Sequence, residues 1–143
     1  MRFMMLMHPG ERPEKGLMPD EKGIAAMMKY NEELTKSGIL LGLDGLQPSA
    51  KGARITWKDG KPKVTDGPFT ESKELLGGYW MIQVKSKEEA VEWAKRIPAD
   101  PDQMVELRQV FEMSDFNIDP KSDINAQVER VSAGVEAANK GKK

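Results

Sequence analysis

Two side chains in this sequence are candidates for proton transfer, His8 and Asp66. His8 is the only histidine in the chain, and histidine is the side chain whose charge ordinarily changes between about pH 5 and 8. Asp66 directly precedes Gly67-Pro68, and a carboxyl group that Phe69 shields from water there could act as a general acid or base. If His8 faces Asp66 or Asp44 across a shared cleft, the pair could transfer a proton. We therefore take His8 and Asp66 as the candidate catalytic residues.

Both residues also have a structural interpretation. An aspartate at a turn commonly caps it by accepting backbone N–H groups, and a histidine at the end of a strand is commonly a surface or hydrogen-bonded residue. Gly67-Pro68 is architectural, because glycine allows backbone conformations that other residues avoid and proline fixes φ. The catalytic and the structural interpretation both stay open at this point.

Several further side chains could line a binding site. Phe69 is either a core residue or a cleft wall, and Tyr79 belongs either to a dimer core or to an aromatic ligand wall. Glu71 lies in a charged loop that is either solvated or the rim of a site, and Arg108 either pairs with a neighbouring glutamate or anchors an anionic ligand. The candidate ligand-binding residues are Asp44, Arg54, Phe69, Glu71, Tyr79 and Arg108.

The composition argues against several classes of protein. Without cysteine there is no thiolate metal site and no cysteine nucleophile, and a single histidine rules out a helical His-x-x-x-His pair, so we predict no metal and no cofactor. Lys and Arg number 22 against 23 Asp and Glu, so we predict neither a nucleic-acid partner nor a membrane partner. The apolar run 3–7 is too short for a signal peptide or a membrane span. We expect a cytoplasmic protein.

The elements that must position these side chains alternate between strands and helices. Helix starts are indicated at Pro19-Asp20 and at Ser86, where Ser86-Lys87-Glu88-Glu89 has the form of a capping box. Asp59-Gly60 is typical of a tight hairpin turn. The predicted strands are 2–7, 39–46, the two arms of a hairpin within 53–64, 75–84 and 104–113; the predicted helices are 20–37 and 87–97.

This order predicts an α+β fold of the ferredoxin-like, split βαβ type, an antiparallel sheet with both helices on one face. The other face is left without cover, so we predict a homodimer. The first helix should bury Ile24, Met27, Met28 and Leu34, and Met4, Met5 and Met81 should also be buried. We divide the chain into a domain of residues 1–113 and an extension of residues 114–143. In the extension, Ile124, Val128, Val131 and Val135 form the stripe of an amphipathic helix before a Lys-rich end at 140–143.

The segment from Asp66-Gly67-Pro68-Phe69 through Glu71-Ser72-Lys73-Glu74 to Gly77-Gly78-Tyr79 resembles the DGPF-domain proteins of the YCII-related family. Supporting matches lie at 2–6, 42–48, 89–94 and 105–111, so the resemblance covers about residues 1–113. It implies a dimeric α+β barrel. The wider family carries a His–Asp pair whose histidine is on the first helix, and at least one relative acts on a chlorinated aromatic ring. Here that helix carries Met27 and Met28 and no histidine.

Two functions are therefore open. The first is a dimeric small-molecule-binding or accessory protein, which the absence of the helix-borne histidine favours. The alternative is a cofactor-independent small-molecule enzyme, lyase- or dehalogenase-like, in which Asp66 and His8 transfer a proton.

Overall fold

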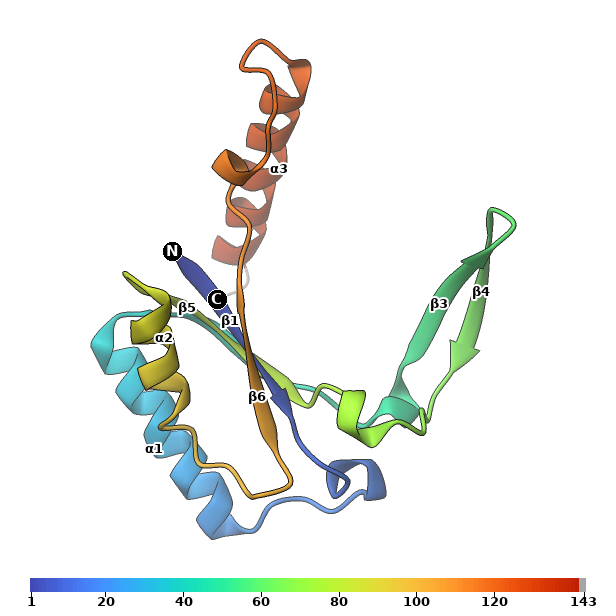
Figure 1. Ribbon diagram of the computed structural model, residues 1–143, viewed down its shortest axis with the longest axis vertical. Helices are drawn as coiled ribbons and strands as arrows, with labels where there is room; N and C mark the ends of the chain where they lie inside the picture. Colours follow the sequence, from blue (N-terminus) through green and yellow to red (C-terminus); the bar gives the residue numbers. More distant parts are fainter. Residues whose placement is uncertain (142–143) are drawn as a thin grey trace. The chain divides into compact units, whose positions relative to one another are not determined.

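The computed structural model describes residues 1–141, apart from the side chain of Ser72. The chain forms two compact units, Met1–Val110 and the part from Phe111 on. The strands are β1 (Arg2–His8), β2 (Leu40–Gly45), β3 (Ala53–Lys58), β4 (Lys61–Asp66), β5 (Gly78–Gln83) and β6 (Met104–Gln109), and the helices are α1 (Glu21–Ser37), α2 (Lys87–Ala94) and α3 (Asp123–Lys140) (Figure 1).

The first unit is built on a four-stranded sheet with the strand order β2-β5-β1-β6. All three pairings are antiparallel, and α1 and α2 lie on the same side of the sheet (Figure 1). This is the strand order of the ferredoxin-like fold, so the predicted α+β class is confirmed. Strands β3 and β4 form a separate two-stranded hairpin.

Helix α1 begins and ends where the sequence signals predict, and α2 begins at the predicted capping box but ends at Ala94 and not at residue 97. The Asp20 carboxylate accepts a hydrogen bond from the Gly23 N–H at 2.8 Å, and the Ser86 hydroxyl accepts one from the Glu89 N–H at 3.1 Å. Each bond satisfies a backbone donor that the first helical turn leaves free. Gly38 ends α1 with φ of 78°, the left-handed conformation that glycine adopts without strain.

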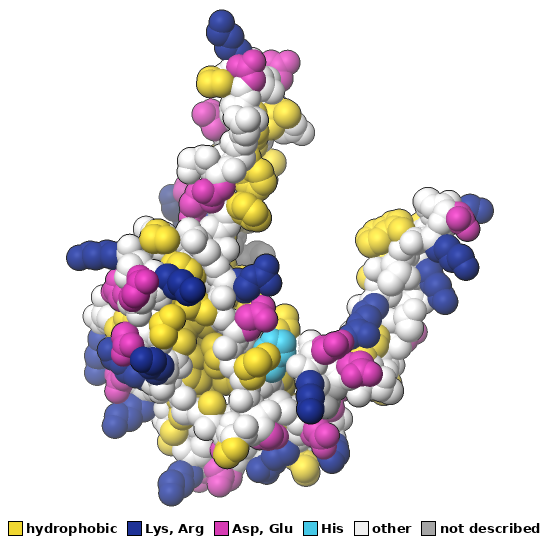
Figure 2. All heavy atoms as spheres, in the orientation of Figure 1, with side chains coloured by type: hydrophobic (Ala, Val, Ile, Leu, Met, Phe, Trp, Pro, Cys, Tyr) yellow, Lys and Arg dark blue, Asp and Glu magenta, His cyan; other side chains and the backbone are white. Residues whose placement is uncertain are grey.

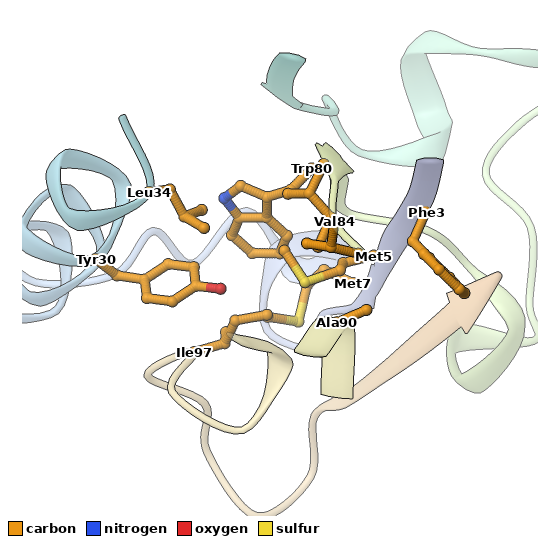
Figure 3. Packing of buried hydrophobic residues seen from close by; sticks show 10 residues of the cluster. Phe3, Met5, Met7, Tyr30, Leu34, Trp80, Val84, Ala90 and Ile97 are labelled. Carbon is orange, nitrogen blue, oxygen red and sulfur yellow. The ribbon is translucent and has the colours of Figure 1, made fainter. Parts of the chain in front are cut away.

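The core lies between the sheet and the two helices. Alternation along β1 buries Phe3, Met5 and Met7. Figure 3 shows Tyr30 and Leu34 of α1 pointing toward the side chains of the sheet. The rings of Tyr30 and Trp80 meet edge to face with centroids 5.9 Å apart, a favourable aromatic geometry.

The predicted buried face of α1 is partly wrong. Ile24 and Met28 are 46% and 51% exposed, whereas Met27 packs against the core and Tyr30 and Leu34 are buried. The buried face of α1 is instead centred on Tyr30 and Leu34, and the Tyr30 hydroxyl donates a hydrogen bond to the Trp93 carbonyl at 2.8 Å. Hydropathy alone ranks a tyrosine below isoleucine and methionine and therefore misses this contact.

Two predicted strands are also shorter than expected. Strand β5 begins at Gly78 and not at residue 75, and a turn of 3-10 helix at Ser72–Glu74 precedes it. Strand β6 ends at Gln109 and not at residue 113, and the next unit begins at Phe111. The Gly77 N–H still bonds to the Met7 carbonyl at 2.8 Å, so hydrogen bonding to β1 extends one residue beyond β5.

The opposite side chains of the strands form the second face of the sheet, which we call the open face. Met4 lies beside Met81, and Leu6 lies beside Tyr79, on neighbouring strands. All four are partly exposed. The predictions of full burial for Met4 and Met81 are therefore wrong for the single chain.

The hairpin turns at Asp59-Gly60, as predicted, with φ of 52° and 74°. Every residue of β3 and β4 is exposed. The hairpin therefore contributes nothing to the core of its own unit.

The second unit consists of a short connection and α3. The rings of Phe111 and Phe116 lie 5.0 Å apart, and the Ser122 hydroxyl caps α3. The predicted stripe lies on this helix, with Ile124, Val131 and Val135 about half exposed or more. Lys142 and Lys143 of the predicted Lys-rich end lie outside the described residues. Across residues 1–141, no helix combines the length and the apolar character needed to cross a membrane.

Candidate functional site

Three polar side chains of the open face, His8, Asp44 and Tyr79, lie toward one end of the sheet. Strand β1 ends at His8, and Asp44 is the last residue but one of β2. Tyr79 is the second residue of β5, and Met104 is the first residue of β6. Because the strands are antiparallel, the ends of β1 and β2 meet the beginnings of β5 and β6. We call this region the loop end of the sheet.

His8 lies on the open face at the loop end. Its position follows from the alternation of β1, which places it on the side of Met4 and Leu6, with Met104 opposite on β6. Figure 2 shows this histidine, in cyan, between hydrophobic side chains over the sheet and the base of the hairpin. Its Nδ1 atom is buried and has no hydrogen-bond partner among the described residues. A buried polar atom without a partner is costly and commonly marks a place where a water molecule, an ion or a ligand binds.

Asp44 and Tyr79 form a hydrogen-bonded pair on neighbouring strands. The Tyr79 hydroxyl donates to the Asp44 carboxylate at 2.7 Å, and the two residues stand opposite each other in the β2–β5 register. The hydrogen bond and the negative charge of Asp44 raise the pKa of Tyr79 above its ordinary value. Tyr79 therefore stays neutral at physiological pH and holds the carboxylate in place.

The Asp-Gly-Pro-Phe turn is attached to two other loops. The Phe69 N–H donates to the Ser49 hydroxyl oxygen at 2.9 Å. Ser49 in turn donates through its N–H and its hydroxyl to the two carboxylate oxygens of Glu14, at 2.7 and 2.5 Å. We call this set of bonds the Glu14–Ser49 latch. A Cβ atom on Gly67 would collide with the Ser49 carbonyl oxygen, so only glycine fits there.

A shallow hollow lies beside this turn. It has a volume of about 370 Å³ and is lined by Glu11, Glu14, Lys15, Pro68, Phe69 and Thr70. The guanidinium group of Arg54 lies over the Phe69 ring, 4.0 Å from its centroid, a cation–π contact that fixes the orientation of the ring. Glu14 is therefore both a wall of the hollow and a member of the latch.

The structure brings some of the predicted site residues together. Asp44 contacts Tyr79, and Arg54 contacts Phe69. The Arg108 guanidinium lies 3.3 Å from the Glu106 carboxylate. Glu106 is the neighbouring glutamate with which Arg108 pairs in its structural interpretation.

The structure leaves other predicted residues apart. Asp66 is exposed at the end of β4, where it is paired with Ala53. It does not bond to Nδ1 of His8, because that atom has no partner among the described residues. Glu71 is exposed in the loop after the turn.

Sequence reasoning missed Glu14 and Ser49. They are separated by 35 residues and lie in loops rich in polar side chains, so no local pattern distinguishes them from solvated loop residues. No group of three or more acidic or histidine side chains that could hold a metal ion occurs in the part of the chain that the structure describes.

Comparison with known proteins adds three findings. An uncharacterized protein of Rhizobium meliloti (strain 1021) is 30% identical over 76 residues, which are 53% of this chain; the match spans about 61% of that relative's length. The solved structure of 5-chloro-2-hydroxyhydroquinone dehydrochlorinase from Burkholderia phenoliruptrix AC1100, in complex with 2,5-dihydroxybenzoquinone, is 14% identical. That similarity covers 80% of this chain and 98% of the other chain, with a TM-score of 0.39. The YCII-related domain matches residues 1–114, and the chain therefore belongs to the YCII-related family.

Proposed function

We propose that this protein is a cytoplasmic, homodimeric small-molecule-binding protein of the DGPF branch of the family, and that its ligand binds at the loop end of the open face. The observation that carries the proposal is the buried Nδ1 of His8, which has no hydrogen-bond partner among the described residues. A ligand that offers this nitrogen a hydrogen bond removes an energetic cost that the free protein bears.

The surroundings of His8 indicate the class of ligand. Leu6, Met81 and Met104 are partly exposed apolar side chains of the open face, and the Asp44–Tyr79 pair borders them. An apolar floor with a few oriented polar groups is typical of sites for small, mostly apolar molecules. We expect a planar ring that carries a hydroxyl or carboxyl group.

The homodimer encloses this site. The open face is apolar along Met4, Leu6 and Met81, which are partly exposed in the single chain, and its β6 side carries the Glu106–Arg108 pair. A second copy packed on it removes this surface from water. Sedimentation at micromolar concentration should give twice the chain mass of 16.0 kDa, and a monomer at that concentration would contradict the homodimer.

Methyl NMR of protein labelled at methionine tests the binding site, with 4-hydroxybenzoate as the probe. We expect the signals of Met104, which stands opposite His8, and of Met81 to shift, whereas Met28, which is exposed on α1, should not. His8→Ala should abolish the shifts and leave the fold intact, because His8 lies at the end of β1. Equal shifts at Met28, or none at any methionine, would contradict the proposed site.

The alternative is a cofactor-independent enzyme with lyase- or dehalogenase-like chemistry, in which Asp66 and His8 transfer a proton. The same unpaired Nδ1 favours it, because a neutral imidazole nitrogen can accept a proton. His8→Gln separates the two functions, since glutamine forms hydrogen bonds but does not titrate. Binding that survives in His8→Gln supports the binding protein; turnover that is lost in both His8→Gln and Asp66→Asn supports the enzyme.

A further inference from the structure

The β3–β4 hairpin has one apolar face and one basic face. Residues paired across the hairpin point to the same side. One side carries Ile55, Trp57, Pro62 and Val64, with Ala53 and Asp66 at its base, and the other carries Arg54, Thr56, Lys58, Lys61, Lys63 and Thr65. In Figure 2 the hydrophobic and the basic side chains of the hairpin lie on different sides.

The apolar face is unusually exposed. Trp57 is 71% exposed, Val64 is 64% exposed and Ile55 is 48% exposed. A two-stranded hairpin on its own is marginally stable in water, and it needs a third strand or a packed surface for support. A cross-strand patch that includes tryptophan is therefore a surface that another molecule should cover.

We propose that the hairpin is an arm by which each protomer grips a second copy of the chain, with Trp57 as its anchor. This inference rests on the homodimer proposed above and names a surface that the packing of the two open faces does not include.

The distribution of charge favours a protein surface as the occupant. When the apolar face of the hairpin is buried, Lys58, Lys61 and Lys63 point away from the contact. On an anionic lipid surface or a nucleic acid, the lysines would have to face the contact, and Ile55 and Val64 would then stay in water. When a second copy covers the apolar face, the lysines remain solvated. Their charge then disfavours the binding of additional chains to the outer side of the arm.

The area also favours a second copy. Four strands of six or seven residues present a face of roughly 19 Å by 20 Å, because strands lie about 4.8 Å apart and each residue adds about 3.3 Å. Two such faces cover roughly 800 Å² in projection, a flat area that is smaller than the accessible surface they would bury. A hairpin face measures roughly 10 Å by 20 Å, so two arms and the surfaces that they cover add roughly another 800 Å². The arms therefore about double the projected contact area between two copies.

Trp57 reports on the arm directly. The chain has three tryptophans, and the signal of Trp57 is the difference between the wild-type protein and Trp57→Phe. We expect acrylamide to quench Trp57 readily in dilute monomer and poorly in the dimer. We expect Trp57→Lys to raise the dissociation constant of the dimer at least about tenfold, as for an anchor residue of an interface.

Thr56→Lys is the matched control, because it places the same side chain on the neighbouring residue but on the basic face. It should change the dissociation constant by less than about twofold, as surface substitutions outside a contact do. Circular dichroism should be the same for both variants, since both positions are exposed. Should Trp57→Lys fail to fold, the quenching of the wild-type protein still decides the question.

The outcomes separate this inference from the homodimer. A dimer in which Trp57 remains open to acrylamide overturns the arm and leaves the homodimer standing. A monomer at every concentration overturns both. Protection of Trp57 from acrylamide in the monomer overturns the arm in favour of another occupant. So does a blue shift of the Trp57 emission on vesicles of phosphatidylcholine and phosphatidylserine, if Trp57 is not protected in the dimer.

Discussion

Replacing Ser49 by alanine tests whether the Glu14–Ser49 latch holds the Asp-Gly-Pro-Phe turn in place. The substitution removes the hydroxyl that donates to the Glu14 carboxylate at 2.5 Å and accepts from the Phe69 N–H at 2.9 Å. A hydrogen bond to a charged group contributes about 1.5–3 kcal/mol to stability and a neutral one about 0.5–1.5 kcal/mol. Ser49, Glu14 and Phe69 are all only partly buried, so water replaces part of both bonds. We therefore expect a loss of about 2 kcal/mol in the free energy of unfolding.

Urea unfolding followed by circular dichroism measures this loss. Ser37→Ala is the matched control, because its hydroxyl donates to the Leu34 carbonyl at 2.6 Å in the last turn of α1, and it should cost less than about 1 kcal/mol. In a double-mutant cycle, Ser49→Ala and Glu14→Ala should show a coupling energy of at least about 1 kcal/mol. A loss below about 0.5 kcal/mol for Ser49→Ala, or additive single effects, would refute the latch.

Three further predictions concern single residues. Burial raises the pKa of Tyr30 from 10.0 to about 12. The stability that the neutral Tyr30 side chain contributes is therefore fully present below about pH 10 and is lost as the pH rises through about 12. Urea midpoints should fall over this range in the wild-type protein and should fall less in Tyr30→Phe. Asp44→Asn should lower the pKa of Tyr79, because the carboxylate is the main cause of its elevation, and ultraviolet absorbance of tyrosinate measures the change. Leu34 is fully buried, so Leu34→Ala should cost about 3 kcal/mol in urea unfolding, and a cost below about 1 kcal/mol would contradict its place in the core.

The parts of the fold that depend on local sequence could be predicted. The helix starts at Asp20 and Ser86 and the turn at Asp59-Gly60 depend on residues within four positions of one another. The short apolar run 3–7, bounded by His8-Pro9-Gly10, places strand β1, and the order of strands and helices then leaves few topologies.

The parts that depend on distant contacts could not be predicted. The burial of Tyr30 on α1 comes with a hydrogen bond to Trp93, 63 residues away. The latch joins Glu14 to Ser49 across 35 residues, and neither residue stands out in its own loop. Asp66 was singled out by its motif, but the position of its carboxyl group depends on the hairpin, whose residues all lie outside the core.

Nitrogen NMR of the imidazole tests the proposed binding function most directly, because the chain has a single histidine and only its Nδ1 and Nε2 signals have to be distinguished. We expect the Nδ1 resonance of His8 to shift in a saturable manner as 4-hydroxybenzoate is added to the homodimer, since the ligand supplies the hydrogen bond that this buried atom lacks. An Nδ1 resonance that stays unchanged while the probe binds elsewhere, or while it does not bind at all, would contradict a ligand site at the loop end of the sheet.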